Sequence, residues 1–193
     1  MIIRILTSSL LLLWLTSFAS AESLNGTCTV HFYGKSTLHD FDGQVACHPF
    51  DLVVEENESG TQVIRQAVVE IRVREMDTAN DRRDNKMRSM FESSKYPLIR
   101  SRFADLDLTA LIERLQAGGS DPARLDFNLQ IRDRSLPMQA EIRNIKAAPE
   151  QITFDLEFPL SLASYRLEPP SVLGLIRVDD LVRVEASVQL RRD

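Results

Sequence analysis

The chain has 193 residues, of which 23 are Lys or Arg and 28 are Asp or Glu, so its net charge at neutral pH is −5. This acidic balance argues against nucleic acid as a partner and against electrostatic docking on anionic membranes. A chain of this length is expected to form a single domain around one core.

Residues 1–21 have the pattern of a secretory signal peptide. Arg4 gives a positive start, a short apolar run follows, and the small residues Ala19 and Ala21 form the exit. We therefore predict one domain over residues 22–193, whose 22 basic and 28 acidic residues give a net charge of −6 once Arg4 is lost. An uncleaved anchor is less favoured because the sequence is polar from Glu22 onward. No later segment predicts a transmembrane helix, so stable membrane insertion is not expected.

The two cysteines of the predicted mature chain lie in segments that favour a β-hairpin. Apolar residues alternate with mostly polar ones along both segments, and a turn near Thr37 and Leu38 aligns them. This register produces four pairs on the apolar face: Cys28/Cys47, Val30/Val45, Phe32/Gly43 and Gly34/Phe41. Because the register also places each glycine opposite a phenylalanine, we predict a disulfide between the cysteines, stabilising by about 3 kcal/mol in the chain-entropy model. The alternative is two buried free thiols.

Alternation of apolar and polar residues predicts four further antiparallel strands, over residues 67–73, 125–131, 152–158 and 182–190. Between Asp77 and Pro97 the period changes, because Met87, Met90 and Phe91 follow one another at helical spacing among charged residues. This segment predicts one amphipathic helix of about three turns. A strand is expected to restart after Pro97, with its alternation lost near Ala104.

Two segments leave the local structure open or irregular. Residues 108–115 fit either a short helix or a strand edge, and residues 117–122 form a loop rich in glycine. About eight strands with one helical insertion indicate an all-β fold, either a closed barrel or a sandwich. The uneven spacing of the turns favours a closed eight-stranded antiparallel barrel, whose interior is wide enough for one small ligand.

Neither catalysis nor metal binding is expected. Ser36, His39 and Asp40 are the residue types of a hydrolytic triad, but neighbouring side chains on an extended segment point to opposite faces. A turn in which Ser36 or Asp40 accepts backbone N–H groups is the favoured reading. In the predicted hairpin His31 and His48 lie on the order of 13 Å apart and do not share one ion. We predict no catalytic residue, no metal ligand and no cofactor.

Four segments together resemble proteins of the YceI-like family, in the same order along the chain. They are residues 34–43, residues 83–97 with Arg83, Asp84, Phe91 and Pro97, the hairpin over 125–142, and residues 167–178. The resemblance covers Leu24 to Leu190. One departure is at Arg132–Ser135, where the family often has a glycine-threonine turn, so the shape of this turn is left open.

The resemblance implies a lipocalin-like antiparallel barrel that holds a polyisoprenoid or similar long-chain lipid, usually in a bacterial periplasm. Apolar strand faces and the helix supply the predicted lipid-binding residues: Phe32, Val69, Ile71, Met90, Phe91, Phe103, Phe127, Phe154 and Val184. A filled core needs the same residues, so the sequence alone leaves cavity and packed core both open. Met90 and Phe91 are expected at one end of the barrel, either as plain packing or as a lid.

The leading hypothesis is a periplasmic protein that carries or stores a lipid with its tail inside the barrel. The alternatives are a periplasmic hydrolase and a small outer-membrane barrel. Charged residues opposite the apolar faces, such as Glu70, Arg72 and Glu185, argue against the membrane barrel because they would fill its interior with charge. Association of two barrels into a homodimer is left open.

Overall fold

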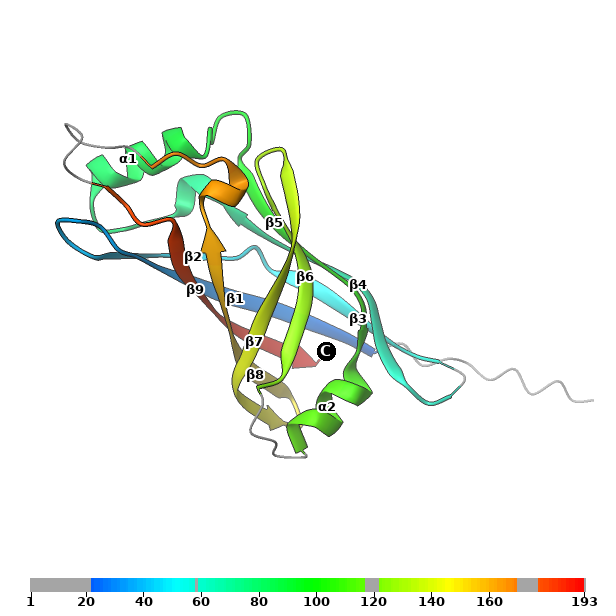
Figure 1. Ribbon diagram of the computed structural model, residues 1–193. Helices are drawn as coiled ribbons and strands as arrows, with labels where there is room; N and C mark the ends of the chain where they lie inside the picture. The colour runs from blue at the N-terminus through cyan, green and yellow to red at the C-terminus, as the bar shows by residue number, and fades with distance from the viewer. Residues whose placement is uncertain (1–21, 58, 117–121, 170–176, 193) are drawn as a thin grey trace, which may run out of the picture.

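The strands follow the segments in which apolar and polar residues alternate. The computed structural model describes residues 22–57, 59–116, 122–169 and 177–192, so the predicted signal peptide lies outside the described residues. Within these ranges nine strands form one antiparallel sheet (Figure 1). They are β1 (Glu22–Gly34), β2 (Phe41–Ala46), β3 (Phe50–Glu56), β4 (Gln62–Arg72), β5 (Leu98–Asp107), β6 (Arg124–Ile131), β7 (Arg134–Ala148), β8 (Gln151–Ser161) and β9 (Leu181–Arg192).

The sheet closes on itself because the first strand pairs with the last. β1 pairs with β9 from Leu24↔Arg192 to Tyr33↔Arg183. On its other edge, β1 pairs first with β3 and then with β2, so these two short strands share one position in the ring. The nine strands therefore occupy eight positions, and the predicted closed eight-stranded antiparallel barrel is confirmed.

The hairpin of β1 and β2 has the predicted register. Val30 pairs with Val45, Phe32 with Gly43, and Gly34 with Phe41. The predicted disulfide joins Cys28 to Cys47, whose Cα atoms are 5.3 Å apart. Gly43 is required at its position, since a Cβ atom there would meet the Phe32 ring and lie 2.8 Å from the carbonyl oxygen of Asp77. Alternation, glycine placement and the disulfide thus agree on one arrangement.

The loss of alternation near Ala104 has a local backbone cause. Asp105 has a φ of 48°, in the left-handed region, and interrupts the regular pleat of β5. Before it, Phe103 pairs with Ala67, and beyond it Leu106 pairs with Ile64. All four side chains belong to the same apolar cluster, so both strands change parity together and keep their apolar faces inward.

Two helices lie at opposite ends of the barrel (Figure 1). α1 (Asp81–Met90) confirms the predicted helix, and the Asn80 side chain caps it by accepting from the Arg83 backbone N–H at 3.1 Å. Asp84 is buried and accepts both the backbone N–H and the hydroxyl of Thr78, which fixes α1 to the preceding segment. α2 (Leu108–Gln116) is a second helix in the segment that the sequence left open. No helix of the described residues is long and apolar enough to cross a bilayer.

The turn between β6 and β7 is made without the family's usual glycine. Ile131 pairs with Arg134, so Arg132 and Asp133 form a two-residue turn, with Arg132 at a φ of 55°. The Arg132 side chain is ion-paired with Glu92, just after α1. The barrel is therefore closed with Arg132 and Asp133 in this turn.

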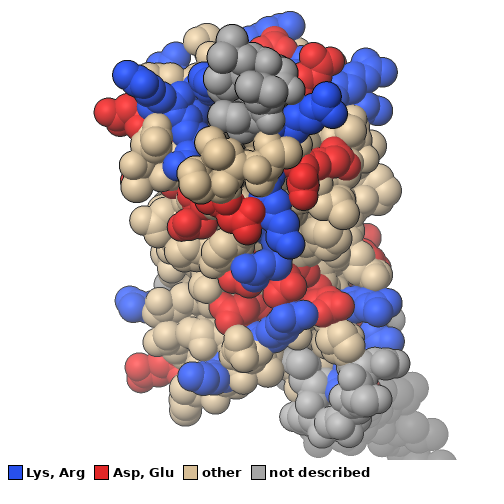
Figure 2. Space-filling view, turned by 60° about the vertical axis from the view of Figure 1, so that its left-hand side comes forward, with Lys and Arg blue, Asp and Glu red and all other residues tan. Residues whose placement is uncertain are grey.

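Charged side chains cover the outer face of the strands. Arg143 pairs with Glu141 at 2.9 Å and with Glu157 at 2.8 Å, and Arg100 pairs with Glu70 at 2.5 Å. Figure 2 shows both signs of charge intermixed along one side of the molecule. The outer wall is thus polar, and the apolar faces of the strands meet inside.

A buried tyrosine lies in the short helical turn η2 (Ala163–Tyr165), between β8 and β9. Tyr165 is 1% exposed, and its hydroxyl donates to the Leu129 carbonyl oxygen at 3.1 Å. Burial raises the pKa of Tyr165 to about 12. The folded state therefore favours the neutral, protonated form of the Tyr165 hydroxyl.

We expect Tyr165→Phe to remove part of the alkaline loss of stability. An unfolded tyrosine has a pKa of about 10, so the stability that Tyr165 contributes is present below that pH and is lost as pH rises towards about 12. At neutral pH the variant should be less stable by about 1 kcal/mol, because the Leu129 carbonyl loses its donor. Urea unfolding at neutral pH and near pH 11 measures both effects. If the free energy of unfolding fell equally in both proteins between neutral pH and pH 11, the prediction would be wrong.

Candidate ligand-binding cavity

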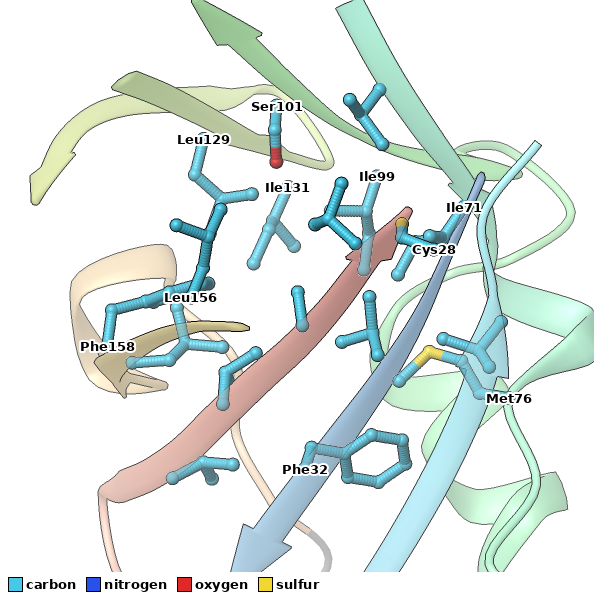
Figure 3. Close-up of a pocket in the computed structure, with 18 of the residues that line it drawn as sticks. Cys28, Phe32, Ile71, Met76, Ile99, Ser101, Leu129, Ile131, Leu156 and Phe158 are labelled. Carbon is cyan, nitrogen blue, oxygen red and sulfur yellow. The ribbon is translucent and has the colours of Figure 1, made fainter. Parts of the chain in front are cut away.

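The inward faces of the strands enclose a cavity of about 690 Å³. Its wall is apolar along most of its length, and Figure 3 shows side chains such as Phe32, Ile99, Leu129 and Leu156 converging on the same space. The volume lies within the range of roughly 300–1,000 Å³ that is usual for ligand sites. The barrel is therefore hollow, which settles the choice between cavity and packed core that the sequence left open.

Every residue predicted from the sequence as lipid-binding lies on the cavity wall. The strands contribute Phe32, Val69, Ile71, Phe103, Phe127, Phe154 and Val184, and the α1 segment contributes Met90 and Phe91. Three rings pack together on this wall. The Phe127 ring centroid lies 5.3 Å from that of Phe103 and 5.2 Å from that of Phe158. These rings give one side of the cavity a rigid surface.

A single hydroxyl interrupts the apolar middle of the wall, and sequence reasoning missed it. Ser101 on β5 lines the cavity between Ile99 and Phe103, and its oxygen is visible in Figure 3. Within the described residues this hydroxyl has no hydrogen-bond partner in the protein. Ser101 lies two residues from each neighbour on the same strand face, so strict counting of alternation from Ile99 would have found it.

The two ends of the cavity differ in polarity. At the α2 end the wall is formed by aliphatic side chains, including Leu108, Leu111, Ile112 and, from a bulge in β7, Ile145. At the α1 end the wall includes polar and charged side chains: Ser36, His39, Asp40, Thr78, Asn80, Arg82, Arg83 and Lys86. An amphiphile matches this arrangement, with its tail towards α2 and its polar group at α1.

The residues that resemble a hydrolytic triad form a turn at the α1 end. The Ser36 hydroxyl donates to the backbone carbonyl of His39 at 2.6 Å and accepts the His39 backbone N–H at 3.2 Å. The oxygen of Ser36 is therefore bonded to the main chain of His39, as the capping interpretation predicts. Asp40 lines the same end of the cavity.

The histidines lie apart from one another. His31 pairs with Gln44 inside the hairpin, as predicted. His48 lies beyond the end of β2, where its backbone N–H donates to the Glu70 carbonyl and its ring nitrogen Nδ1 lies 3.8 Å from the Glu70 carboxylate. In the described part of the chain, no three His, Cys, Asp or Glu side chains are grouped as metal ligands.

A closed eight-stranded barrel around an apolar cavity defines the lipocalin-like class of hollow barrels. Within that class the chain belongs to the YceI-like family, because the model of the YceI-like domain matches residues 20–190. No curated protein matches the sequence.

The solved structures similar to this chain include the following two. One is a polyisoprenoid binding domain from Saccharophagus degradans, implicated in plant cell wall breakdown, with a TM-score of 0.60 and 15% identity. The match covers 88% of this chain and 98% of that one. The other is BcnA from Burkholderia cenocepacia, with a TM-score of 0.61 and 14% identity over 84% of this chain and 95% of that one.

Proposed function

We propose that this protein binds a long-chain amphiphilic lipid, a polyisoprenoid or similar molecule, inside its barrel and carries or stores it in the periplasm. The observation that carries the proposal is the apolar cavity of about 690 Å³, polar at one end only. The polyisoprenoid-binding domain of S. degradans, which has the same fold, supports the choice of ligand class.

The cavity wall supplies enough apolar surface to retain a lipid tail. Burying one CH₂ group contributes roughly 0.8 kcal/mol, so two or three isoprene units give on the order of 8–12 kcal/mol before the costs of association. Because this energy grows evenly with tail length, it does not select one lipid. The choice of lipid therefore rests on the length of the cavity and on the polar end.

Two features support a periplasmic location. A signal peptide directs export, and the sequence predicts one over residues 1–21; the Cys28–Cys47 disulfide is typical of an oxidising compartment. The alternative of an outer-membrane barrel is disfavoured by the ion pairs of Arg143 and Arg100 on the outer face, where a membrane barrel carries an apolar band.

The hydrolase alternative finds no support in the polar end of the cavity. A nucleophile needs a base within hydrogen-bond reach, but the Ser36 hydroxyl is engaged with the main chain of His39. The Ser101 hydroxyl faces the cavity among aliphatic and aromatic side chains. A binding function therefore accounts for the geometry better than catalysis does.

Mass spectrometry of an organic extract tests the proposal. Protein purified from the periplasm without detergent should release one dominant long-chain lipid in near-stoichiometric amount, absent from an equal extract of an unrelated periplasmic protein. Delipidated protein should then take up a fluorescent isoprenoid. If the extract contains no lipid and the delipidated protein takes up no probe, the protein is not a lipid carrier.

A further inference from the structure

The charged groups on the cavity wall are confined to one end. Among the described residues that line the cavity, the charged ones are Asp40, Arg82, Arg83 and Lys86, and all four belong to the α1 end. Figure 2, in which this end is uppermost, shows several Lys and Arg side chains around it, with Asp and Glu side chains among them. These charged side chains therefore line the cavity itself, in addition to lying near the surface.

The three basic side chains have no ion-pair partner. Within the described residues, no carboxylate oxygen lies within 4.0 Å of the charged nitrogens of Arg82, Arg83 or Lys86. On the outer wall, by contrast, Arg100 and Arg143 are paired with carboxylates. The carboxylate of Asp84 is buried and bonded to Thr78, and Arg83 is held over the Phe41 ring at 5.3 Å. Three positive charges therefore remain available to a ligand.

The same helix face connects this cluster with the apolar interior. Arg83 and Met87 are four residues apart, as are Lys86 and Met90, so these two basic side chains are each followed one turn later by a methionine on the cavity wall. A lipid whose tail contacts Met87 and Met90 has its polar group beside Arg83 and Lys86.

We propose that Arg82, Arg83 and Lys86 bind an anionic headgroup with about two negative charges, such as a phosphate monoester. This inference rests on the proposed lipid-binding function. Among the Lys, Arg, Asp and Glu residues that line the cavity, three cations and the carboxylate of Asp40 leave a net charge of about two positive units on the wall at the α1 end. A phosphate monoester carries about −1.5 to −2 at neutral pH, and arginine forks match its oxygens. A carboxylate supplies one charge and an alcohol supplies none.

Three probes with the same tail test the inference on the delipidated mature protein. Farnesyl monophosphate, farnesoic acid and farnesol are compared by displacement of a fluorescent isoprenoid. We expect the monophosphate to bind at least about tenfold more tightly than the alcohol, with the acid between them. This preference should decrease as salt rises, because screening weakens charge interactions between partly exposed groups.

Variants then assign the preference to the three residues. In the protein carrying Arg82→Gln, Arg83→Gln and Lys86→Gln, the ratio of phosphate to alcohol affinity should fall to about one. The matched control carries Lys35→Gln and Arg177→Gln, which are exposed but absent from the cavity wall, and should keep the ratio of the native protein. If the triple variant melts early, Lys86→Gln alone, at an exposed position, should still lower the ratio.

The outcomes separate the two proposals. Equal binding of phosphate and alcohol by the native protein overturns the headgroup inference and leaves the lipid carrier intact. Equal binding of acid and phosphate overturns the match to two charges. A preference that persists in the triple variant assigns the headgroup to other residues and also overturns the inference. Failure of every probe, including the fluorescent isoprenoid, overturns the proposed function itself.

Discussion

A tryptophan at Ile71 should weaken lipid uptake strongly while the barrel remains folded. Ile71 lies on β4, and its side chain borders the open volume of the cavity (Figure 3). An indole added there occupies space that a ligand would otherwise fill, instead of displacing packed neighbours. We expect affinity for a fluorescent isoprenoid to fall by at least about tenfold. Titration of the delipidated protein, with thermal unfolding of the same samples, measures both quantities.

Val53→Trp is the matched control for this variant. Val53 lies on β3, faces outward and is 47% exposed, so a tryptophan there should leave uptake unchanged. A packed interior would respond differently, because overpacking costs about 1–3 kcal/mol of stability. If Ile71→Trp unfolds much earlier than the native protein, and native protein takes up no probe, the cavity does not accept lipid.

Loss of the Cys28–Cys47 disulfide should lower the free energy of unfolding by about 3 kcal/mol. The two cysteines are 19 residues apart, and opening a loop of this size restores chain entropy to the unfolded state. Few single changes on the outer surface are expected to cost as much. Urea unfolding of the native protein and of the double variant with Cys28→Ala and Cys47→Ala measures the difference.

Reduction provides an independent check of the same bond. Dithiothreitol should destabilise the native protein by a similar amount and leave the double variant unaffected. Alkylation without reductant, followed by intact-mass measurement, should modify neither cysteine of the protein isolated from the periplasm. Alkylation of both thiols in that experiment would show that the isolated protein lacks the Cys28–Cys47 disulfide.

Alternation of apolar residues was sufficient to predict which strand faces meet inside the barrel, but it left open whether that interior is a cavity or a packed core. A strand that pairs on both edges has only two faces, so the apolar faces containing Val69, Phe127 and Val184 had to meet inside once the sheet closed. The hairpin register was predictable for a further reason. Only one alignment places Gly43 beside Phe32 while also bringing Cys28 to Cys47.

The polar end of the cavity was not predicted, because it depends on how a helix sits on the barrel. Within α1, Arg82, Arg83 and Lys86 read as ordinary solvated residues, and periodicity assigns only Met87, Met90 and Phe91 to the interior. The rotation of the helix is set by Asp84, whose buried carboxylate accepts a hydrogen bond from the Thr78 hydroxyl. Thr78 lies before the helix, outside its hydrophobic repeat. Hydrophobic spacing carries no information about such a contact.

The sequence indicated where two backbone irregularities lie, near Ala104 and at Arg132–Ser135, but not their conformation. Asp105 and Arg132 both adopt positive φ values without being glycine, at 48° and 55°. Such conformations are uncommon for these residue types and are retained only where the surroundings compensate. Asp105 is ion-paired with Arg65, and Arg132 with Glu92, which lie 40 residues away in each case along the chain. Local sequence does not reveal these partners.

The pairing of β1 with β9 also constrains the order in which the protein folds. Tyr33 and Glu185, whose side chains meet across this seam, are 152 residues apart, whereas the disulfide spans 19. The hairpin can therefore form early and be locked covalently, while the other edge of β1 waits for the end of the chain. Until β9 arrives, β1 presents unpaired N–H and C=O groups that can recruit a strand from another molecule. Barrel closure is thus the step at which assembly competes with aggregation.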